Sequence, residues 1–257
     1  MNGPAESPRV ALVTGAGRRV GRAIALGLAN DGFAVALHYN GSAAGAEEAR
    51  DEIVAAGGRA ISLQHDLTSP EDSGVLIEQT RAQLGPVNVL VNSASLFDED
   101  QITTLTPDSW RKLVDVNLSA PVFLIQAFAR QSPVPDSAAV VNILDTQMTS
   151  ASPERFSYFC GKFGLEGATR LAAFDLASKG ITVNAVAPGL VLPSAQTQEE
   201  FDARQKLTPL GQGLGPDDIV NGVRYLIGAR QVTGHVLVVD AGQRMMGMGN
   251  TPIAPAD

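Results

Sequence analysis

Short runs of apolar, β-branched residues alternate along this chain with longer segments in which apolar residues recur at helical spacing. Seven runs are predicted as strands, at residues 10–14, 34–37, 60–63, 87–91, 139–144, 181–186 and 235–239. Each run is apolar on both faces, which is typical of strands covered by helices on either side. The alternation predicts a doubly wound, mostly parallel α/β sheet of the Rossmann type, a three-layer αβα fold.

A single domain over residues 1–257 is predicted, because this length suits one such sheet and neither a repeat nor a Pro/Ser-rich linker marks a second unit. The alternation of strand and helix patterns is interrupted only between residues 190 and 215, by Pro193, Pro209 and several glycines. We expect a long excursion over the carboxyl edge of the sheet there, placed to act as a substrate loop or lid.

Composition and charge favour an ordinary soluble globular protein, with 44% apolar and 5% aromatic residues. The start carries no basic stretch followed by an apolar run, and no stretch offers about 18 uninterrupted apolar residues, so a cytoplasmic location without membrane insertion is expected. The net charge of −8 disfavours nucleic acid as a partner. Cys160 is the only cysteine and the three histidines are isolated, so we expect neither a disulfide nor a metal site.

The first predicted strand leads into a glycine-rich turn and an alanine-rich helix, through Thr14-Gly15-Ala16-Gly17-Arg18-Arg19-Val20-Gly21. Glycines let the backbone approach a pyrophosphate, and the N–H groups at a helix start favour its charge. The turn fits T-G-x-x-x-R-x-G rather than G-x-G-x-x-G, because the third residue after Gly17 is Val20. A plain tight turn is the alternative, but the strand-turn-helix context favours a dinucleotide held by Gly15, Arg18, Arg19 and Val20.

NADP(H) is the predicted cofactor because the second strand does not end in the acidic residue that would hold an NAD ribose. The segment there offers neutral donors, in the order His38-Tyr39-Asn40-Gly41-Ser42, while Arg18 and Arg19 can supply positive charge to a 2′-phosphate. Arg18 could equally be a solvated surface residue. After the third strand, Asp66 and Leu67 are placed to reach the adenine, although Asp66 could instead cap the following turn.

Tyr158 and Lys162 form the candidate reactive pair. They stand at i and i+4 in a segment of helical pattern that continues to about residue 177, so both lie on one helix face. A nearby ammonium favours the phenolate and would bring the phenol pKa towards neutrality, which suits a proton donor. Taken alone, Y-x-x-x-K also occurs by chance in many helices as a solvated pair.

Further motifs follow in chain order, namely Leu90-Val91-Asn92-Ser93-Ala94-Ser95, Asp115-Val116-Asn117-Leu118 and Ala187-Pro188-Gly189. With the glycine turn and the Tyr-Lys pair, they make residues 10–242 resemble the short-chain dehydrogenase/reductase family. The resemblance implies that Tyr158 is the catalytic acid/base, Lys162 its partner and a nicotinamide-ribose ligand, and Asn117 the anchor of a water-linked proton relay. Cofactor-lining roles are implied for Asn92, Ala94, Pro188 and Gly189. It also implies a homotetramer, built partly from the helix with Tyr158 and from residues 235–244.

Asp145 stands thirteen residues before the tyrosine, where most of the family has a serine that bonds the substrate carbonyl. Together with Arg19, His38-Tyr39 and the Asn-x-Ala-Ser motif, this aspartate resembles the pteridine reductase branch, which includes dihydromonapterin reductases. The branch implies that Phe97 stacks on a pterin and that Ser95 and Arg19 bind its polar edge and the cofactor phosphates. Reduction of a ring C=N needs a proton at nitrogen, which a carboxyl beside the phenol can orient or replenish.

Other interpretations stay open from the sequence. Phe97 could be plain core, and Asp145 could cap the next segment. Gly41, Ser93 and Ala241 depart from residues that are usual in the branch or the family. A carbonyl reductase acting on a 3-oxoacyl or sugar-like substrate is the first rival. The second is a non-catalytic NADP-binding sensor or interaction protein, which would be expected to have lost part of the tetrad that this chain retains.

Overall fold

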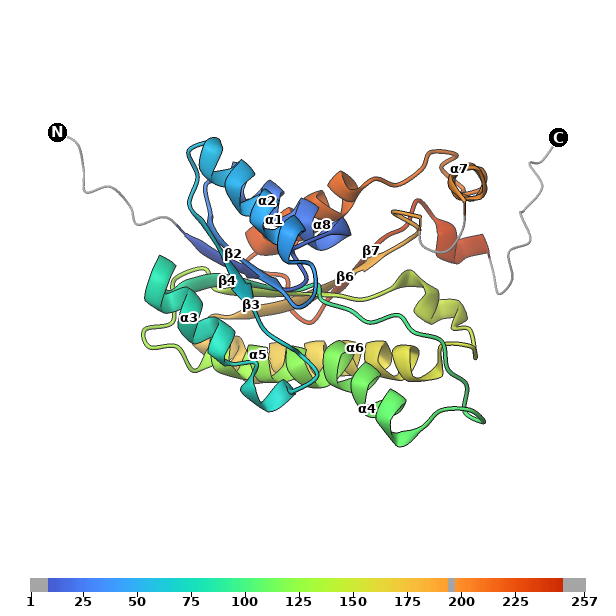
Figure 1. Ribbon diagram of the computed structural model, residues 1–257, viewed down its shortest axis with the longest axis horizontal. Helices are drawn as coiled ribbons and strands as arrows, with labels where there is room; N and C mark the ends of the chain where they lie inside the picture. The colour runs from blue at the N-terminus through green and yellow to red at the C-terminus, as the bar shows by residue number, and fades with distance from the viewer. Residues whose placement is uncertain (1–8, 194–196, 247–257) are drawn as a thin grey trace.

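Seven parallel strands form one sheet in the order β3-β2-β1-β4-β5-β6-β7 (Figure 1). The computed structural model describes residues 9–193 and 197–246. The strands are β1 (Val10–Val13), β2 (Ala34–Tyr39), β3 (Ala60–Gln64), β4 (Val87–Asn92), β5 (Ala139–Ile143), β6 (Thr182–Pro188) and β7 (Val236–Val239). The predicted fold class is confirmed, and each predicted strand is present with ends that differ by one or two residues.

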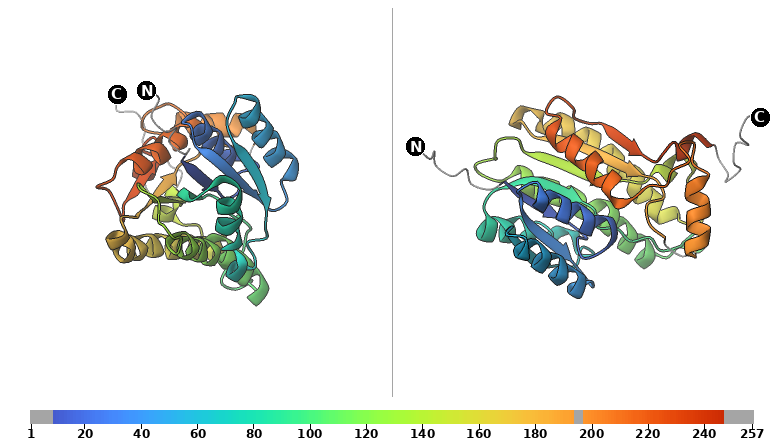
Figure 2. Two further views of the ribbon diagram at one scale, coloured as in Figure 1. Left: turned by 90° about the vertical axis from the view of Figure 1, so that its left-hand side faces the viewer. Right: turned by 90° about the horizontal axis from the view of Figure 1, so that it is seen from above.

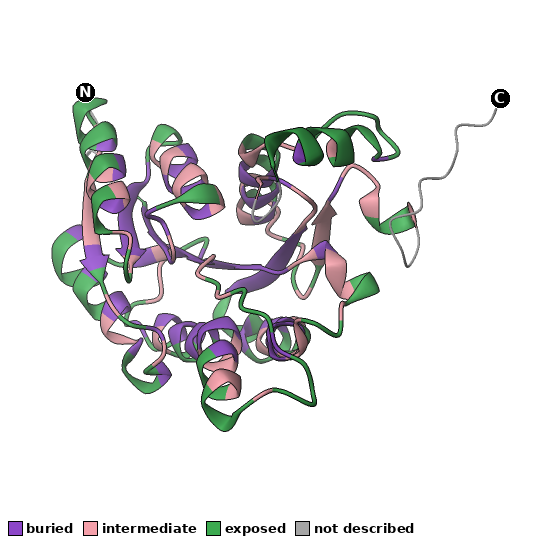
Figure 3. Ribbon diagram, turned by 45° about the vertical axis from the view of Figure 1, so that its right-hand side comes forward, coloured by how far each residue is buried: buried purple, intermediate pink, exposed green. Residues whose placement is uncertain are grey.

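Helices cover both faces of this sheet, as the apolar strands require. On one face lie α1 (Arg19–Asn30), α2 (Ala43–Ala55) and α8 (Pro216–Gly228), which pack side by side in the view from above in Figure 2. The other face carries α3 (Val75–Leu84), α4 (Pro107–Val114), α5 (Ala120–Ala129) and α6 (Phe156–Leu176). Figure 3 shows the buried strands enclosed between helices whose outer surfaces are exposed.

Alternate residues of β1 pack against the two helical layers on opposite faces of the sheet. Val10 and Leu12 of β1 belong to the apolar cluster beneath α3 and α5, whereas Ala11 and Val13 belong to the cluster beneath α1 and α8. This is the period of two that a pleated strand imposes. The carboxyl ends of β2 and β4 lie on either side of the carboxyl end of β1, with which both strands pair.

The chain order reverses at β1, which pairs with β2 on one side and β4 on the other. In an open parallel sheet, such a switch point leaves a crevice at the carboxyl ends of the strands. The predicted excursion over this edge contains a nine-residue helix, α7 (Gln198–Lys206), on the stretch expected to be loop. Residues 194–196 of the excursion lie outside the described residues, and its role as a lid stays a prediction.

One helical stretch, Pro107–Ala129, is long and apolar enough to cross a membrane by length and composition, within the part of the chain that the structure describes. It runs through α4, a π-helical turn at Asp115–Ser119 and α5. Half of its most apolar window is buried in the protein, and α5 contributes Leu124 and Phe128 to the core. This stretch is therefore explained as a core helix of the fold.

His38, at the end of β2, ties the glycine turn to the sheet. Its Nδ1 accepts a hydrogen bond from the Gly15 N–H at 3.2 Å, and its Nε2 lies 3.1 Å from the His65 carbonyl oxygen. A carbonyl only accepts, so the ring is neutral with its proton on Nε2. His38 borders the cavity described below while both of its ring nitrogens contact protein groups, and its role as a cofactor ligand stays a prediction.

We expect this arrangement to make stability depend on pH. Burial lowers the pKa of His38 to about 4 from an ordinary 6.5, so the unfolded chain binds a proton that the folded chain excludes between these values. The contribution of His38 to the free energy of unfolding is therefore complete above pH 6.5. It falls by on the order of 3 kcal/mol as the pH drops towards 4. The measurement is the free energy of unfolding by urea between pH 4.5 and 7 at fixed protein concentration.

The matched comparison uses His38→Asn and His235→Asn, because His235 is exposed and its variant should keep the slope of the native protein. His38→Asn should flatten the decline below pH 6.5. A slope that is unchanged in His38→Asn would contradict the assignment of the neutral, buried ring.

Candidate active site

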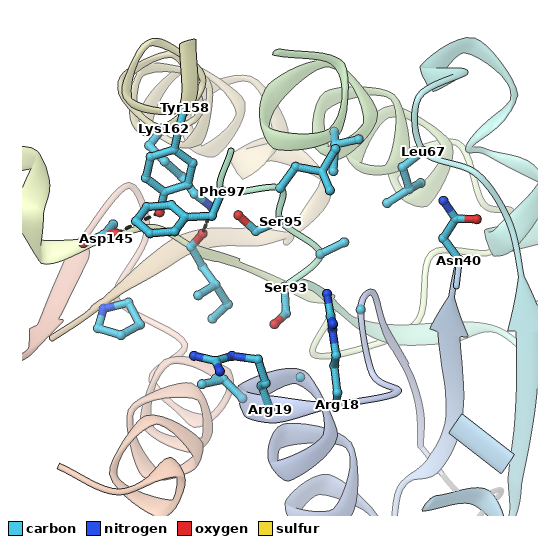
Figure 4. Close-up of a pocket in the computed structure, with 18 of the residues that line it drawn as sticks. Arg18, Arg19, Asn40, Leu67, Ser93, Ser95, Phe97, Asp145, Tyr158 and Lys162 are labelled. Atoms are coloured by element: carbon cyan, nitrogen blue, oxygen red, sulfur yellow. Dashed lines mark hydrogen bonds between the residues drawn. The ribbon is translucent and has the colours of Figure 1, made fainter. Parts of the chain in front are cut away.

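A cavity of about 920 Å³ lies at the carboxyl edge of the sheet, between the glycine turn and the start of α6 (Figure 4). Most of the predicted site residues line it, although they come from distant parts of the chain. Those residues are Gly15, Arg18, Arg19, Val20, His38, Asn40, Ser42, Asp66, Leu67, Ala94, Ser95, Phe97, Asp145, Tyr158, Lys162, Pro188 and Gly189.

Three predicted residues do not line the cavity. The Asn92 side chain lies in the sheet, where its Nδ2 donates to Asn142 Oδ1 at 2.8 Å, and its place beside a cofactor stays a prediction. Tyr39 also falls outside the wall, because the alternation along β2 places it on the other side of the strand from its neighbours His38 and Asn40. Asn117 is fully buried one layer behind the wall.

The glycine turn is held close to the end of β4. Thr14 Oγ1 accepts hydrogen bonds from the N–H groups of Ser93 and Ala94, each at 3.0 Å. Gly15 has a left-handed φ of +67°, and a Cβ there would lie 2.8 Å from Ala94 Cα. Only glycine meets both constraints, and the result is a cradle of exposed backbone at the start of α1 that fits a pyrophosphate.

The far end of the cavity is lined by Arg18, Asn40, Gly41, Ser42 and Asp66. Asn40 and Ser42 are neutral, as the sequence predicts, and Arg18 is exposed at the rim. Asp66 Oδ1 accepts from the Thr68 N–H at 3.0 Å and from Asn40 Nδ2 at 3.3 Å. The Asp66 carboxylate therefore caps the turn after β3, while its predicted contact with an adenine stays a prediction.

Arg19 connects the glycine turn to the segment that follows β6. Its Nη1 donates to the Pro193 carbonyl at 2.7 Å and its Nη2 to the Leu192 carbonyl at 3.3 Å. The backbone of Arg19 has a φ of +54°, which a residue with a side chain rarely adopts. Its predicted contacts with a pterin edge and with cofactor phosphates remain predictions, since its guanidinium holds that segment.

Tyr158 and Lys162 project from the first turns of α6, which runs as far as the sequence predicts. The Tyr158 hydroxyl donates to Asp145 Oδ2 at 2.8 Å. Lys162 Nζ donates to the Ile143 carbonyl at 2.8 Å and lies 5.6 Å from the centroid of the Tyr158 ring. Burial lowers the pKa of Lys162 to about 8, an effect that the charge of Asp145 opposes.

Asp145 makes hydrogen bonds that fit both interpretations left open by the sequence, the cap and the contact with the phenol. Its Oδ1 accepts from the Gln147 N–H at 2.7 Å and so caps the short helix Thr146–Ser150, while its Oδ2 accepts from the phenol. The two functions use different oxygens of one carboxyl group. Burial raises the pKa of Asp145, and the hydrogen bonds from Gln147 and Tyr158 oppose that rise.

The pKa of Tyr158 is raised well above 10, by burial first and then by the adjacent negative charge of Asp145. The prediction that a neighbouring ammonium lowers it is therefore wrong for this arrangement of side chains. The reason is geometric, because the charged partner of the phenol is Asp145, and Lys162 directs its ammonium to a backbone carbonyl. Tyr158 is thus kept protonated, as a proton donor must be.

Phe97 packs its ring against the Tyr158 ring. Its ring is 38% exposed and lines the cavity, with its centroid 4.6 Å from that of Tyr158 at an interplanar angle of 81°. That exposure excludes the plain-core interpretation. Nearby, Ser95 Oγ donates to Asn117 Oδ1 at 2.7 Å, which connects the cavity wall to the buried asparagine in the π-helical turn.

Sequence reasoning missed several residues that shape the site. Lys112 and Gln147 line the cavity, and Lys112 forms an ion pair with Asp98 at 2.9 Å. Asp100 and Arg155 join the segment after β4 to the start of α6. Thr14 belongs to the glycine motif, which the sequence shows. Asp100 and Arg155 contact residues more than 50 positions away, and contacts of that kind leave no pattern in one sequence.

Comparison with known proteins places these features in a family. The family profile described as short chain dehydrogenase matches residues 9–205. A 3-oxoacyl-(acyl-carrier-protein) reductase of Staphylococcus epidermidis is 34% identical over 240 residues, which cover 91% of this chain and 98% of that protein.

Two solved structures are also similar. One is FolM Alternative dihydrofolate reductase 1 from Brucella canis complexed with NADP, with 36% identity and a TM-score of 0.89 over 96% of this chain and 98% of the other. The Brucella suis protein of the same description, also in complex with NADP, has 37% identity and a TM-score of 0.87 over 92% and 95%. Because the profile spans most of the chain and relatives above 30% identity cover nearly all of it, this protein belongs to the short-chain dehydrogenase/reductase family.

Proposed function

We propose that this protein is an NADPH-dependent reductase that adds hydride to a C=N bond of a pteridine ring, such as a dihydropterin or dihydrofolate, with Tyr158 as the proton donor. The observation that carries the proposal is the 2.8 Å hydrogen bond from the Tyr158 hydroxyl to Asp145 in the cavity wall. Similarity to two structures described as alternative dihydrofolate reductases supports it.

The side chains around the phenol suit protonation of a ring nitrogen. When bound, NADPH supplies the hydride, and the nitrogen then needs a proton from the protein. Tyr158 holds that proton at its Oη, and Asp145 accepts the hydrogen bond that orients it. After transfer, the phenolate needs a new proton. The Asp145 carboxylate can take up a proton from solvent and pass it to the phenolate across the same hydrogen bond, a role that the hydroxyl of a serine could not fill in the same way.

The cavity residues support NADP(H) rather than NAD(H). The end of β2 offers Asn40 and Ser42 in place of an acidic residue, and Arg18 lines the same part of the cavity. An arginine near the adenine ribose suits a 2′-phosphate, whereas an acid there would repel it. Lys162 stands where the family resemblance implies a ligand of the nicotinamide ribose. Asn117 stands where it implies the anchor of the water-linked proton relay.

A carbonyl reductase is the second candidate, and the similarity to 3-oxoacyl-(acyl-carrier-protein) reductases favours it. Asp145 separates the two proposals, since a carboxylate acceptor is a poor replacement for a hydroxyl that must donate to a substrate carbonyl. A non-catalytic NADP-binding sensor is disfavoured because Tyr158, Lys162 and Asn117 all remain in place.

The direct assay follows NADPH oxidation by the purified protein, with a dihydropterin, dihydrofolate, a 3-oxoacyl thioester and a simple ketone tested in parallel. NADH serves as the cofactor control. We expect turnover on the dihydropterin with NADPH. Turnover confined to the carbonyl compounds would overturn the pteridine proposal and favour the second candidate.

Asp145→Ala should lower kcat/KM for the dihydropterin by about 100-fold, the size typical of losing general acid-base assistance. The affinity for NADPH, measured by fluorescence, should change by less than about twofold because Asp145 lies at the substrate end of the cavity. Tyr158→Phe is the comparison variant: it should abolish turnover with the fold retained. Full activity of either variant would refute the proposed proton route.

Arg18→Ala should raise the Kd for NADPH by about tenfold or more and leave that for NADH nearly unchanged, because one charge-assisted contact to the 2′-phosphate is lost. Arg22→Ala is the matched control on α1, since Arg22 forms an ion pair with Glu52 at 2.7 Å. Equal weakening of NADPH and NADH in Arg18→Ala would count against a phosphate contact.

We also propose that the protein assembles as a homotetramer, as the family resemblance implies, and acts in the cytoplasm. Exposed apolar side chains on α6 support assembly, with Phe174 89%, Leu171 75% and Phe163 48% exposed in the single chain. Phe174→Asp should shift the sedimentation coefficient to that of a smaller species. An unchanged sedimentation profile would show that this face of α6 is not an interface.

A further inference from the structure

Arg155, immediately before α6, makes three separate contacts with the segment that carries Phe97. Its guanidinium Cζ lies 3.8 Å from the centroid of the Phe97 ring. Its Nη1 donates to the Phe97 carbonyl at 3.1 Å, and its Nη2 forms an ion pair with Glu99 at 2.9 Å. One side chain therefore contacts the Phe97 ring, the Phe97 backbone and the Glu99 carboxylate.

The segment needs such support because residues 93–99 form neither helix nor strand. An aromatic side chain on a loop with 38% exposure has rotamer freedom that it loses when a ligand stacks on it. The cation over its face reduces that freedom before binding, and a guanidinium stacks well on an aromatic ring.

The position of Arg155 leaves the ring available to a substrate. Phe97 lines the cavity, whereas Arg155, whose guanidinium Cζ lies 3.8 Å from the ring centroid, does not. Tyr158 lies beside the same ring, with the two centroids 4.6 Å apart. Phe97 is thus fixed at one site that borders both the cavity and the proton donor.

A different residue, Asp100, holds the backbone at the start of α6. Its Oδ1 accepts from the Ser157 N–H at 2.9 Å, its carbonyl accepts from the Phe156 N–H at 3.1 Å, and its N–H donates to the Glu154 carbonyl at 3.0 Å. None of these bonds uses the Arg155 side chain, and Arg155 itself makes no side-chain cap to α6. Loss of that side chain therefore leaves the helix start held.

We propose that Arg155 is a positioning residue that fixes Phe97 as a stacking surface, beside Tyr158, for a flat aromatic heterocycle. This inference rests on the proposed pteridine function and deepens it. It makes Arg155, a residue outside the cavity, responsible for holding the ring on which a flat substrate stacks. Arg155 does not line the cavity and acts on a bound ring through Phe97. Its charge also lowers the pKa values of Asp145 and Tyr158, so the effect on stacking is read from the pterin Kd, which includes no proton transfer step.

The test compares Arg155→Met, Arg155→Lys and Glu99→Gln with the unaltered enzyme. Arg111→Met is the matched control, because Arg111 is 71% exposed and pairs only with Asp108 at 3.4 Å within the described structure. Steady-state kinetics with a dihydropterin give KM and kcat. Calorimetry gives the Kd of an oxidised pterin for the enzyme–NADP⁺ complex, and fluorescence gives the Kd of NADPH.

Arg155→Met should raise both the pterin Kd and the KM by about tenfold, the size of one lost aromatic stacking contact. The NADPH Kd should change by less than about threefold, since the cofactor contacts remain. The kcat should change less than the pterin Kd, because Arg155 acts on Tyr158 and Asp145 only through its charge. Arg155→Lys, which keeps a cation, should recover part of the loss, and Glu99→Gln should raise the pterin Kd by about twofold to threefold. A purely structural role would instead lower the melting temperature and disturb the pterin Kd, the KM, the kcat and the NADPH Kd together.

Three outcomes overturn the inference in different ways. Unchanged pterin Kd and KM in Arg155→Met, with an active native enzyme, would refute the positioning role and leave the pteridine function standing. Parallel loss of kcat, NADPH affinity and thermal stability would identify Arg155 as a general structural residue. Failure of the unaltered enzyme to bind or reduce any pterin would overturn the proposed function and the stacking role together.

Discussion

The hydrogen bond from the Tyr158 phenol to the Asp145 carboxylate is the interaction on which the rest of the active site depends. It joins the first turn of α6 to the residues that follow β5, at the edge of the sheet where the cavity opens. Tyr158 is buried and Asp145 is partly buried, and loss of water around each group is the main cause that raises its pKa. The phenol therefore keeps its proton, and the carboxylate fixes the direction in which that proton points.

The parallel sheet makes this pairing possible because it brings separate carboxyl ends of strands to one edge. β1 supplies the glycine cradle, β2 supplies His38 to support it, β4 leads to Phe97, and β5 leads to Asp145. Helix α6 then places Tyr158 and Lys162 across the cavity from the cradle. A cofactor at the cradle and a substrate beneath Phe97 would thus meet next to the proton donor.

The sequence predicted the fold closely, because strands buried on both faces are apolar throughout and the glycine turn has a strict backbone requirement. It also indicated Asp145, whose spacing from Tyr158 places it in the same motif position as the usual serine. It did not reveal that His38 supports the turn, that Asn92 bonds within the sheet, or that Lys162 faces a carbonyl, since each depends on side-chain direction. Arg155 and Asp100 could not be predicted at all, because their partners lie more than 50 residues away in the chain.

The most direct test of the Tyr158–Asp145 pairing is an absorbance titration of the phenol in the enzyme without added ligands, with Tyr158→Phe subtracted so that Tyr39 and Tyr225 cancel. The pairing predicts that the tyrosinate band assigned to Tyr158 is absent up to pH 10, because both burial and the adjacent carboxylate oppose ionisation. A Tyr158 band that develops near neutral pH would show a phenol activated by the ammonium of Lys162, and would contradict the central role of Asp145.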